Sequence, residues 1–223
     1  MNRAARAARV RPLTTGALLT TLAVAGACWA LTLPRMSGMD MGVQTSLGSI
    51  TFFLGLWAPM MAAMMLPGAA AAVVRAVRAE PHARVVPLFL VSYLGVWTLL
   101  GLAAYAVYRP HSTTVAGAVV VAAGLYELTP LKRRFRRRCL ESRGSGLLFG
   151  IDCVGSSIGL MLALLAVSAM SVIVMALVAL LVLAQKLLPE RAAHDVPLAA
   201  AIIAFGLVIL LAPAAVPGLT PPM

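Results

Sequence analysis

Seven long runs of apolar residues constrain the fold of this chain more than any other feature. They cover residues 18–33, 50–74, 85–107, 115–128, 147–167, 171–183 and 196–215, with few charges inside them. An α-helix needs about 20 apolar residues to cross the hydrocarbon core of a bilayer. The runs are continuous and do not alternate with polar residues, which favours helices over barrel strands. We therefore expect an all-α, polytopic transmembrane helical bundle of about seven spans, with six possible, and a single integral membrane domain over residues 1–223.

The positions of the positive charges predict how these spans are oriented. The formal net charge is +11, from 18 Lys and Arg against 7 Asp and Glu. If the helices are threaded in series with the N-terminus inside, every Lys and Arg except Arg35 and Arg109 falls on the inner side. This is the positive-inside rule, and it explains the charge without nucleic acid as a partner. It predicts a multi-pass protein of the cell (inner) membrane, with residues 1–12 as a basic cytoplasmic tail.

A dense basic segment lies between the fourth and fifth apolar runs. We expect residues 132–146 to form a polybasic cytoplasmic loop that binds anionic lipid headgroups, at about 1 kcal/mol per basic residue. The lipid-facing residues of this loop would be Lys132, Arg133, Arg134, Arg136, Arg137 and Arg138. Glu127 lies about one turn before Lys132, at the end of an apolar run. We expect its carboxylate to form an ion pair with this loop.

The cysteines predict no disulfide framework. There are three of them, and the threading places Cys28 toward the outer end of the first helix and Cys139 and Cys153 near the inner face. The basic N-terminus, the apolar run and the residues around Cys28 also resemble a lipoprotein signal. However, the apolar run continues past Cys28, as expected for a retained helix. Cleavage or lipidation at Cys28 is therefore the less favoured alternative.

Methionine is the residue type that most suggests a function. Four of the 12 methionines cluster in the second apolar run at Met60, Met61, Met64 and Met65. At 100° per residue they share one helix face with Trp57, and the length of helix outside them places them near the bilayer midplane. Pro59 and Pro67 flank them and would locally open the helix. Thioethers are soft ligands that suit Cu(I). The alternative is that methionine only fills gaps in the packing.

Further sulfur ligands lie outside this cluster. Residues 34–49 are expected to form a Met-rich outer loop, whose thioethers would capture the ion at Met36, Met39 and Met41. In the fifth apolar run, Met161 would add a ligand at mid-depth and Cys153 an acceptor at the inner side. Met170 and Met175, near the last outer turn, could assist the capture.

Three segments carry a resemblance to a known family. They are the methionine block with Pro67, the stretch Ala123-Gly124-Leu125-Tyr126 with Leu128-Thr129-Pro130-Leu131-Lys132, and Cys153 and Gly155 followed by Leu160-Met161. Together they resemble a bacterial family of predicted metal-binding integral membrane proteins, a domain-of-unknown-function family. The resemblance covers residues 36–189 and implies a metal-related role.

The chain departs from the pattern of this family at several ligand positions. A Cys-x-x-His-Cys motif of the family is represented here by Phe135, Arg138 and Cys139. The family's Cys-x-Gly-Cys-Cys-Trp motif here has Ser156, Ser157 and Ile158 after Cys153 and Gly155, and Glu127 replaces a glutamine. The resemblance therefore favours a thioether site for Cu(I) over a divalent-metal thiolate site at the inner side.

Three classes of function follow. We favour a membrane protein that binds a soft metal ion, most simply Cu(I), and conducts it or hands it to a soluble metal-binding partner. The alternative is a non-catalytic assembly or interaction subunit, in which the Met and Gly faces only pack helices. An intramembrane oxidoreductase is the least favoured class, because His82, His111 and His194 fall in expected loops on alternating sides. We expect no catalytic residues.

Overall fold

The chain is all-helical over the part that the structure describes. The structure is a computed structural model, and it describes residues 3–36, 47–142, 145–168, 171–188 and 192–213. In these residues the helices are α1 (Arg3–Met36), α2 (Ile50–Ala79), α3 (Val85–Val107), α4 (Thr113–Glu127), α5 (Pro130–Glu141), α6 (Gly146–Ser168), α7 (Val172–Leu187) and α8 (Ala192–Leu211). The same ranges contain no strand. The predicted all-α class is confirmed.

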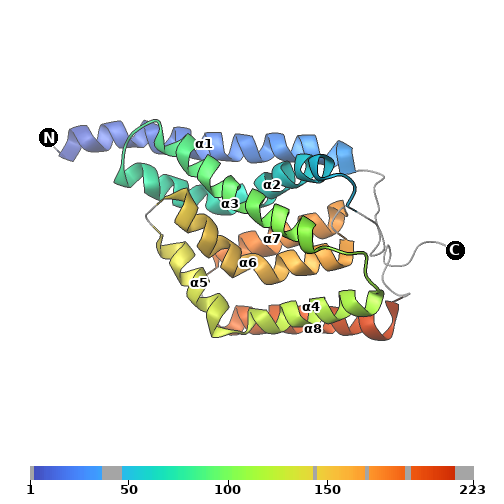
Figure 1. The fold of residues 1–223 in the computed structure, drawn as a ribbon. Helices are drawn as coiled ribbons and strands as arrows, with labels where there is room; N and C mark the ends of the chain where they lie inside the picture. Colours follow the sequence, from blue (N-terminus) through green and yellow to red (C-terminus); the bar gives the residue numbers. More distant parts are fainter. Residues whose placement is uncertain (1–2, 37–46, 143–144, 169–170, 189–191, 214–223) are drawn as a thin grey trace.

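The helices form an elongated bundle (Figure 1). The long helices α1 and α2 pack along one side, and α4 pairs with α8 along the opposite side. Helices α3, α6 and α7 lie between these two pairs, and α5 runs obliquely across one end of the bundle. The contacts of α3, α4, α5 and α7 with α6 make α6 the hub that joins the two sides.

Each of the seven apolar runs coincides with one helix, and these helices differ in length. Four described segments are long and apolar enough to cross a membrane: Val10–Met36, Ile50–Ala79, Val85–Val107 and Gly146–Val167. The pair Thr113–Glu127 and Pro130–Glu141, bent by 64°, is a possible fifth span. Val172–Leu187 and Asp195–Leu211 are shorter apolar helices. In the described part of the chain, four or five helices could therefore cross a membrane by length and composition.

Helix α2 is the most deeply buried helix of the bundle. It begins after Ser49, whose hydroxyl accepts a hydrogen bond from the backbone N–H of Phe52 and so caps the helix. Its methionines are buried, but Ala62 and Ala63, on the opposite face, are buried as well. These alanines therefore pack against protein.

The expected polybasic loop is wrong in its conformation, because most of it is helix α5. The hydroxyl of Thr129 accepts a hydrogen bond from the N–H of Lys132, and Pro130 occupies the first turn. A capping threonine followed by proline is a strong helix start. Residues spaced three or four apart then form an inward face made of Lys132, Phe135, Arg136 and Cys139.

Two of the six residues expected to face lipid are instead buried in ion pairs. Lys132 pairs with Glu127, as expected for that carboxylate, and Gln185 donates a second hydrogen bond to it at 2.7 Å. Arg136 pairs with Asp195 at 2.7 Å. A buried charge is retained only when a partner compensates it, and α4 and α8 supply these partners. Four arginines of α5 remain exposed: Arg133, Arg134, Arg137 and Arg138.

Candidate functional site

The predicted sulfur ligands of the membrane interior all lie in the protein core. Each methionine of the α2 cluster, as well as Met161 and Cys153 on α6, is at most 3% exposed. All of them belong to one contiguous hydrophobic core. These side chains are therefore shielded from water, an environment that favours a weakly hydrated soft ion over a hard one.

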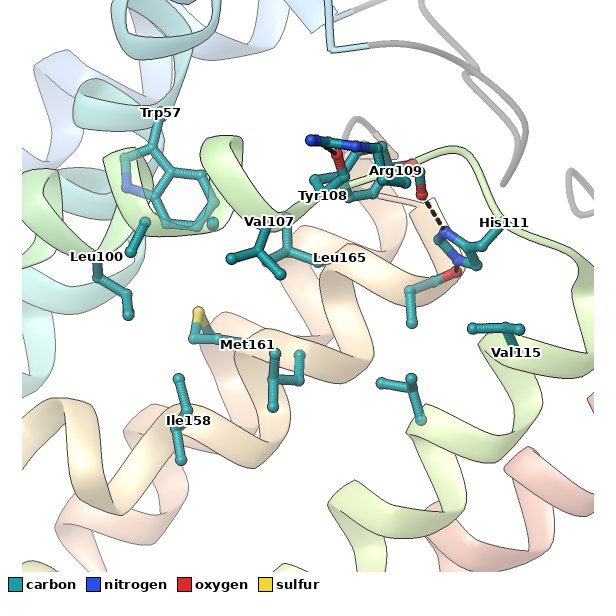
Figure 2. Close-up of a pocket in the computed structure, with 15 residues that line it drawn as sticks. Trp57, Leu100, Val107, Tyr108, Arg109, His111, Val115, Ile158, Met161 and Leu165 are labelled. Atoms are coloured by element: carbon teal, nitrogen blue, oxygen red, sulfur yellow. Dashed lines mark hydrogen bonds between the residues drawn. The ribbon is translucent and has the colours of Figure 1, made fainter.

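One end of the α2 methionine segment lies near Met161. Trp57, one turn before Met60 and Met61, lines the same cavity as Met161, and Figure 2 shows both side chains at this cavity. The indole N–H of Trp57 donates to the carbonyl oxygen of Trp97 at 2.8 Å. Helix α3 approaches the indole closely, at Gly101. The indole of Trp57 is thus held in place at the N-terminal end of the methionine segment.

The other end of the segment leads to Cys153. Gly68 lies one turn beyond Met64 and Met65, and the side chain of Lys186 on α7 packs so closely over it that an added Cβ would lie 2.5 Å from the Lys186 Cδ. The Lys186 ammonium then donates to the Cys153 sulfur at 2.9 Å. The methionines of α2 therefore lie between two points on this helix. One is Trp57, which shares a cavity with Met161, and the other is Gly68, which contacts Lys186 beside Cys153.

Side chains from three other helices lie around the Cys153 sulfur on α6. Besides Lys186, the Tyr93 hydroxyl from α3 lies 3.2 Å from it. The buried Cys139 thiol from α5 is close enough to Cys153 for the two thiols to interact electrostatically. The ring of Phe149 closes the group, 5.3 Å from the Tyr93 ring and 5.4 Å from the Lys186 ammonium. We call Tyr93, Cys139, Cys153 and Lys186 the thiol cluster.

The chemistry of the thiol cluster suits a soft monovalent ion. Two thiolates are strong ligands for Cu(I), and an ammonium beside them can offset their negative charge. Harder metal ions usually require imidazole and carboxylate ligands in addition. Within the described ranges, no group of three or more His, Cys, Asp and Glu side chains could hold a metal ion. The cluster therefore offers sulfur ligands and no preformed site of the imidazole and carboxylate type.

The expected outer capture loop is only partly described. Met36 is not in an accessible loop, because it is the last residue of α1 and is 2% exposed. Met39, Met41 and Met170 lie outside the described residues. Met175, on α7, is fully buried. Cys28 is half-buried on α1 and takes no part in the thiol cluster.

Sequence reasoning missed three members of the thiol cluster. The sequence patterns place Cys139 near the inner face and in the remnant of a family motif but predict no site there, and they assign no role to Tyr93 or Lys186. One signal was present for Lys186, since it is a single cation at the end of an apolar run. Such a residue inside a membrane protein usually faces protein or water. Nothing in the sequence indicated that Cys139 would return to Cys153, because the helical state of α5 was not foreseen.

The comparisons with known proteins agree with a role in copper handling. The described residues form an all-helical bundle with several long apolar helices, which is compatible with a membrane protein. A family model described as "PpoB2: Copper chaperone" matches residues 54–209, most of the chain, and the protein therefore belongs to this family. The match includes the α2 methionines and the thiol cluster and leaves out α1 with Met36. No curated protein and no solved structure matches the chain.

Proposed function

We propose that this protein is an integral membrane protein that binds Cu(I) and hands it on, with the thiol cluster as its principal binding site. The observation that carries the proposal is the buried Cys153 sulfur, which lies 2.9 Å from the Lys186 ammonium and interacts electrostatically with the buried Cys139 thiol on the adjoining helix α5. Membership of the copper chaperone family supports copper as the metal.

The charge balance of the thiol cluster supports Cu(I) in particular. Two thiolates and one Cu(I) carry a net charge of −1, and the ammonium of Lys186 brings the group to neutrality. A neutral group is far less costly to bury than a charged one. A divalent ion bound by the same residues would leave an excess positive charge. The hydroxyl of Tyr93 can donate a hydrogen bond to the sulfur of Cys153 and stabilise the thiolate further.

The α2 methionines would serve as weaker ligands on the way to this site. Thioethers carry no charge, so Cu(I) bound only by Met60, Met61, Met64 and Met65 would keep its positive charge in the core and be held less tightly. Met161 lies at the opposite end of this segment from the thiol cluster, and Met39 and Met41 would capture the ion outside. In this order the affinity for Cu(I) increases from the thioether ligands to the thiolate ligands. A soluble metal-binding partner would take the ion at the inner side.

Cu(I) affinity of the purified protein tests this proposal directly. The affinity is measured by competition with a colorimetric Cu(I) chelator under anaerobic, reducing conditions. We expect the Cys139→Ser/Cys153→Ser variant to lose at least about 100-fold in affinity, while the Met60/Met61/Met64/Met65→Leu variant retains tight binding but takes up copper more slowly. Cys28→Ser is the matched control, because Cys28 is a thiol outside the cluster. Unchanged affinity in the double cysteine variant would reject the thiol cluster as the site.

The same measurement separates copper binding from the alternative class, an assembly subunit. If wild-type protein, purified without a partner, takes up no Cu(I), the sulfur side chains only pack helices. Copurification with a fixed partner would then identify the protein as a subunit of a complex.

We further propose seven spans in the cell (inner) membrane, with a cytoplasmic N-terminus. The coincidence of seven apolar runs with seven helices and the one-sided Lys and Arg distribution support this topology. It places α5 at the cytoplasmic surface, where its exposed arginines would contact anionic headgroups. Reporter fusions at residues 83 and 110 should show an inner and an outer location, respectively. The same location for both fusions would contradict the threading.

A further inference from the structure

A large apolar cavity lies apart from the thiol cluster, between α3, α4 and α6. Its volume is about 530 Å³, within the range of about 300–1,000 Å³ that is typical of ligand sites. Figure 2 shows its floor, where Met161 and Ile158 on α6 point toward the space below Val107. Trp57 closes one end. Apart from residues at the rim, the walls are aliphatic or aromatic.

The rim of this cavity is formed by the turn between α3 and α4 and carries a positive charge. Arg109 is exposed, and its Nη1 donates to the carbonyl oxygens of Ala106 and Tyr108 at 3.1 and 2.8 Å. The ring of His111 lies 3.1 Å from the carbonyl oxygens of Arg109 and Ala166, which ties the turn to α6. Burial raises the pKa of the Tyr108 phenol, so Tyr108 adds no negative charge. Among the residues that the structure describes, no acidic side chain lines the cavity.

We propose that this cavity holds one acyl chain of a phospholipid, whose phosphate binds Arg109. An apolar cavity with a single arginine at its rim complements an amphiphile that has an anionic head and an apolar tail. Guanidinium groups bind phosphate through charge-assisted, often bidentate hydrogen bonds. The backbone carbonyls that accept from Nη1 orient the guanidinium of Arg109 and leave its other N–H donors for the phosphate.

The position of the cavity also favours a lipid over a water-soluble ligand. Arg109 follows the end of α3, and in the proposed topology this end lies at the outer surface, at the depth of the headgroups. The tail would then extend from Arg109 toward Met161, along the direction that a lipid chain takes in the bilayer. It would exclude water from Trp57 and Met161. The lipid would thus seal one end of the methionine segment, although its binding does not depend on copper.

Lipid binding by the detergent-purified protein tests the proposal. Phosphatidylglycerol is titrated into the protein, and the bound fraction is measured by native mass spectrometry. We expect one tightly bound phosphatidylglycerol in the wild type and at least about fivefold weaker binding in Arg109→Gln. Arg35→Gln is the matched control, since Arg35 is the other exposed arginine on the proposed outer side. Equal binding in Arg109→Gln and the wild type would overturn the assignment of the phosphate site.

Two further experiments distinguish the contribution of the lipid head from that of its tail. Diacylglycerol, which lacks the phosphate, should bind more weakly than phosphatidylglycerol and should be insensitive to Arg109→Gln. Ala104→Trp fills the cavity from α3 and should weaken the binding of both lipids. Its folding is verified by an unchanged melting temperature. If the folded Ala104→Trp variant binds lipid as the wild type does, or if the wild type carries a second polypeptide on this face in place of lipid, the proposal is wrong.

Discussion

The indole N–H of Trp29 on α1 donates a hydrogen bond to the carbonyl oxygen of Ala63 on α2, at 3.0 Å. Ala63 lies four residues before Pro67, which has no N–H to give to that carbonyl. In a helix without proline the carbonyl of Ala63 would be satisfied within α2. Here Trp29 replaces the missing donor from a neighbouring helix, so the proline creates a specific α1–α2 contact.

We predict that Trp29→Phe destabilises the protein by about 1–2 kcal/mol. The variant keeps an aromatic ring but leaves the buried carbonyl of Ala63 without a donor, and such a group costs about 1–3 kcal/mol in proteins. Interhelical hydrogen bonds in membrane proteins lie at the lower end of this range. The measurement is denaturant or thermal unfolding of the purified protein in detergent.

A double-mutant cycle isolates the role of the proline. Pro67→Ala supplies a backbone N–H that can donate to the carbonyl oxygen of Ala63. In that background Trp29→Phe should therefore lower the free energy of unfolding much less. A coupling energy near zero would show that the indole does not act through the carbonyl of Ala63.

The sequence could predict the helices because their signals are local. Apolar runs of spanning length, the capping Ser49 and the prolines that open α2 are all visible in short windows of sequence. The burial of the α2 methionines also follows from such a window. A short window does not show that Trp29 donates to the carbonyl oxygen of Ala63, because this contact depends on how α1 packs against α2.

The parts of the site that the sequence did not predict depend on tertiary packing. Helix α5 has a local start signal in Thr129 and Pro130, but its basic composition concealed it. Lys132 and Arg136 are buried only because Glu127 and Asp195, on other helices, compensate their charges. Cys139 reaches Cys153 only because α5 folds back on α6. Long-range pairing of this kind leaves no periodic pattern in a single sequence.

The contact between Trp57 and Gly101 gives a second prediction. A Cβ at Gly101 would lie 2.4 Å from the indole of Trp57, which itself is held by the carbonyl of Trp97. We therefore expect Gly101→Ala to displace the indole, to lower stability by about 1–3 kcal/mol and to shift the tryptophan fluorescence. Gly95→Ala, in the same helix with nothing within 4 Å of the added Cβ, should be neutral or stabilising by up to about 1 kcal/mol. Equal effects of the two substitutions would contradict the close contact.

The buried pair of Glu127 and Lys132 gives a third prediction. Glu127→Gln leaves the ammonium of Lys132 buried without a compensating charge, which typically costs about 3–5 kcal/mol. Glu127→Gln/Lys132→Met removes both charges and should recover most of that loss. Glu141→Gln, at an exposed position on α5, should change stability by no more than about 0.5 kcal/mol. Unfolding in detergent measures all three variants, and a double variant as unstable as the single one would argue against the ion pair.

Gly155 on α6 links the packing of α5 to the proposed copper site without being a ligand itself. A Cβ at this position would lie 2.4 Å from the ring of Phe135 on α5. Phe135 lies one turn before Cys139, so a displaced ring would move the Cys139 thiol away from Cys153. Gly155→Ala should therefore weaken Cu(I) binding about tenfold, because overpacking costs about 1–3 kcal/mol and 1.4 kcal/mol corresponds to a factor of ten.

The rescue variant decides whether Gly155 acts through α5. Phe135→Ala removes the ring that an alanine at position 155 would meet, so Gly155→Ala/Phe135→Ala should bind Cu(I) more tightly than Gly155→Ala alone. Chelator competition measures the affinities, and the melting temperature of each variant shows whether the fold is retained. If Gly155→Ala retains its fold and binds Cu(I) as tightly as the wild type, the position of Cys139 relative to Cys153 does not control the site. If both Gly155 variants are equally weak, the glycine acts through a contact other than Phe135. Only recovery in the double variant assigns to α5 the role of holding the second thiol in place.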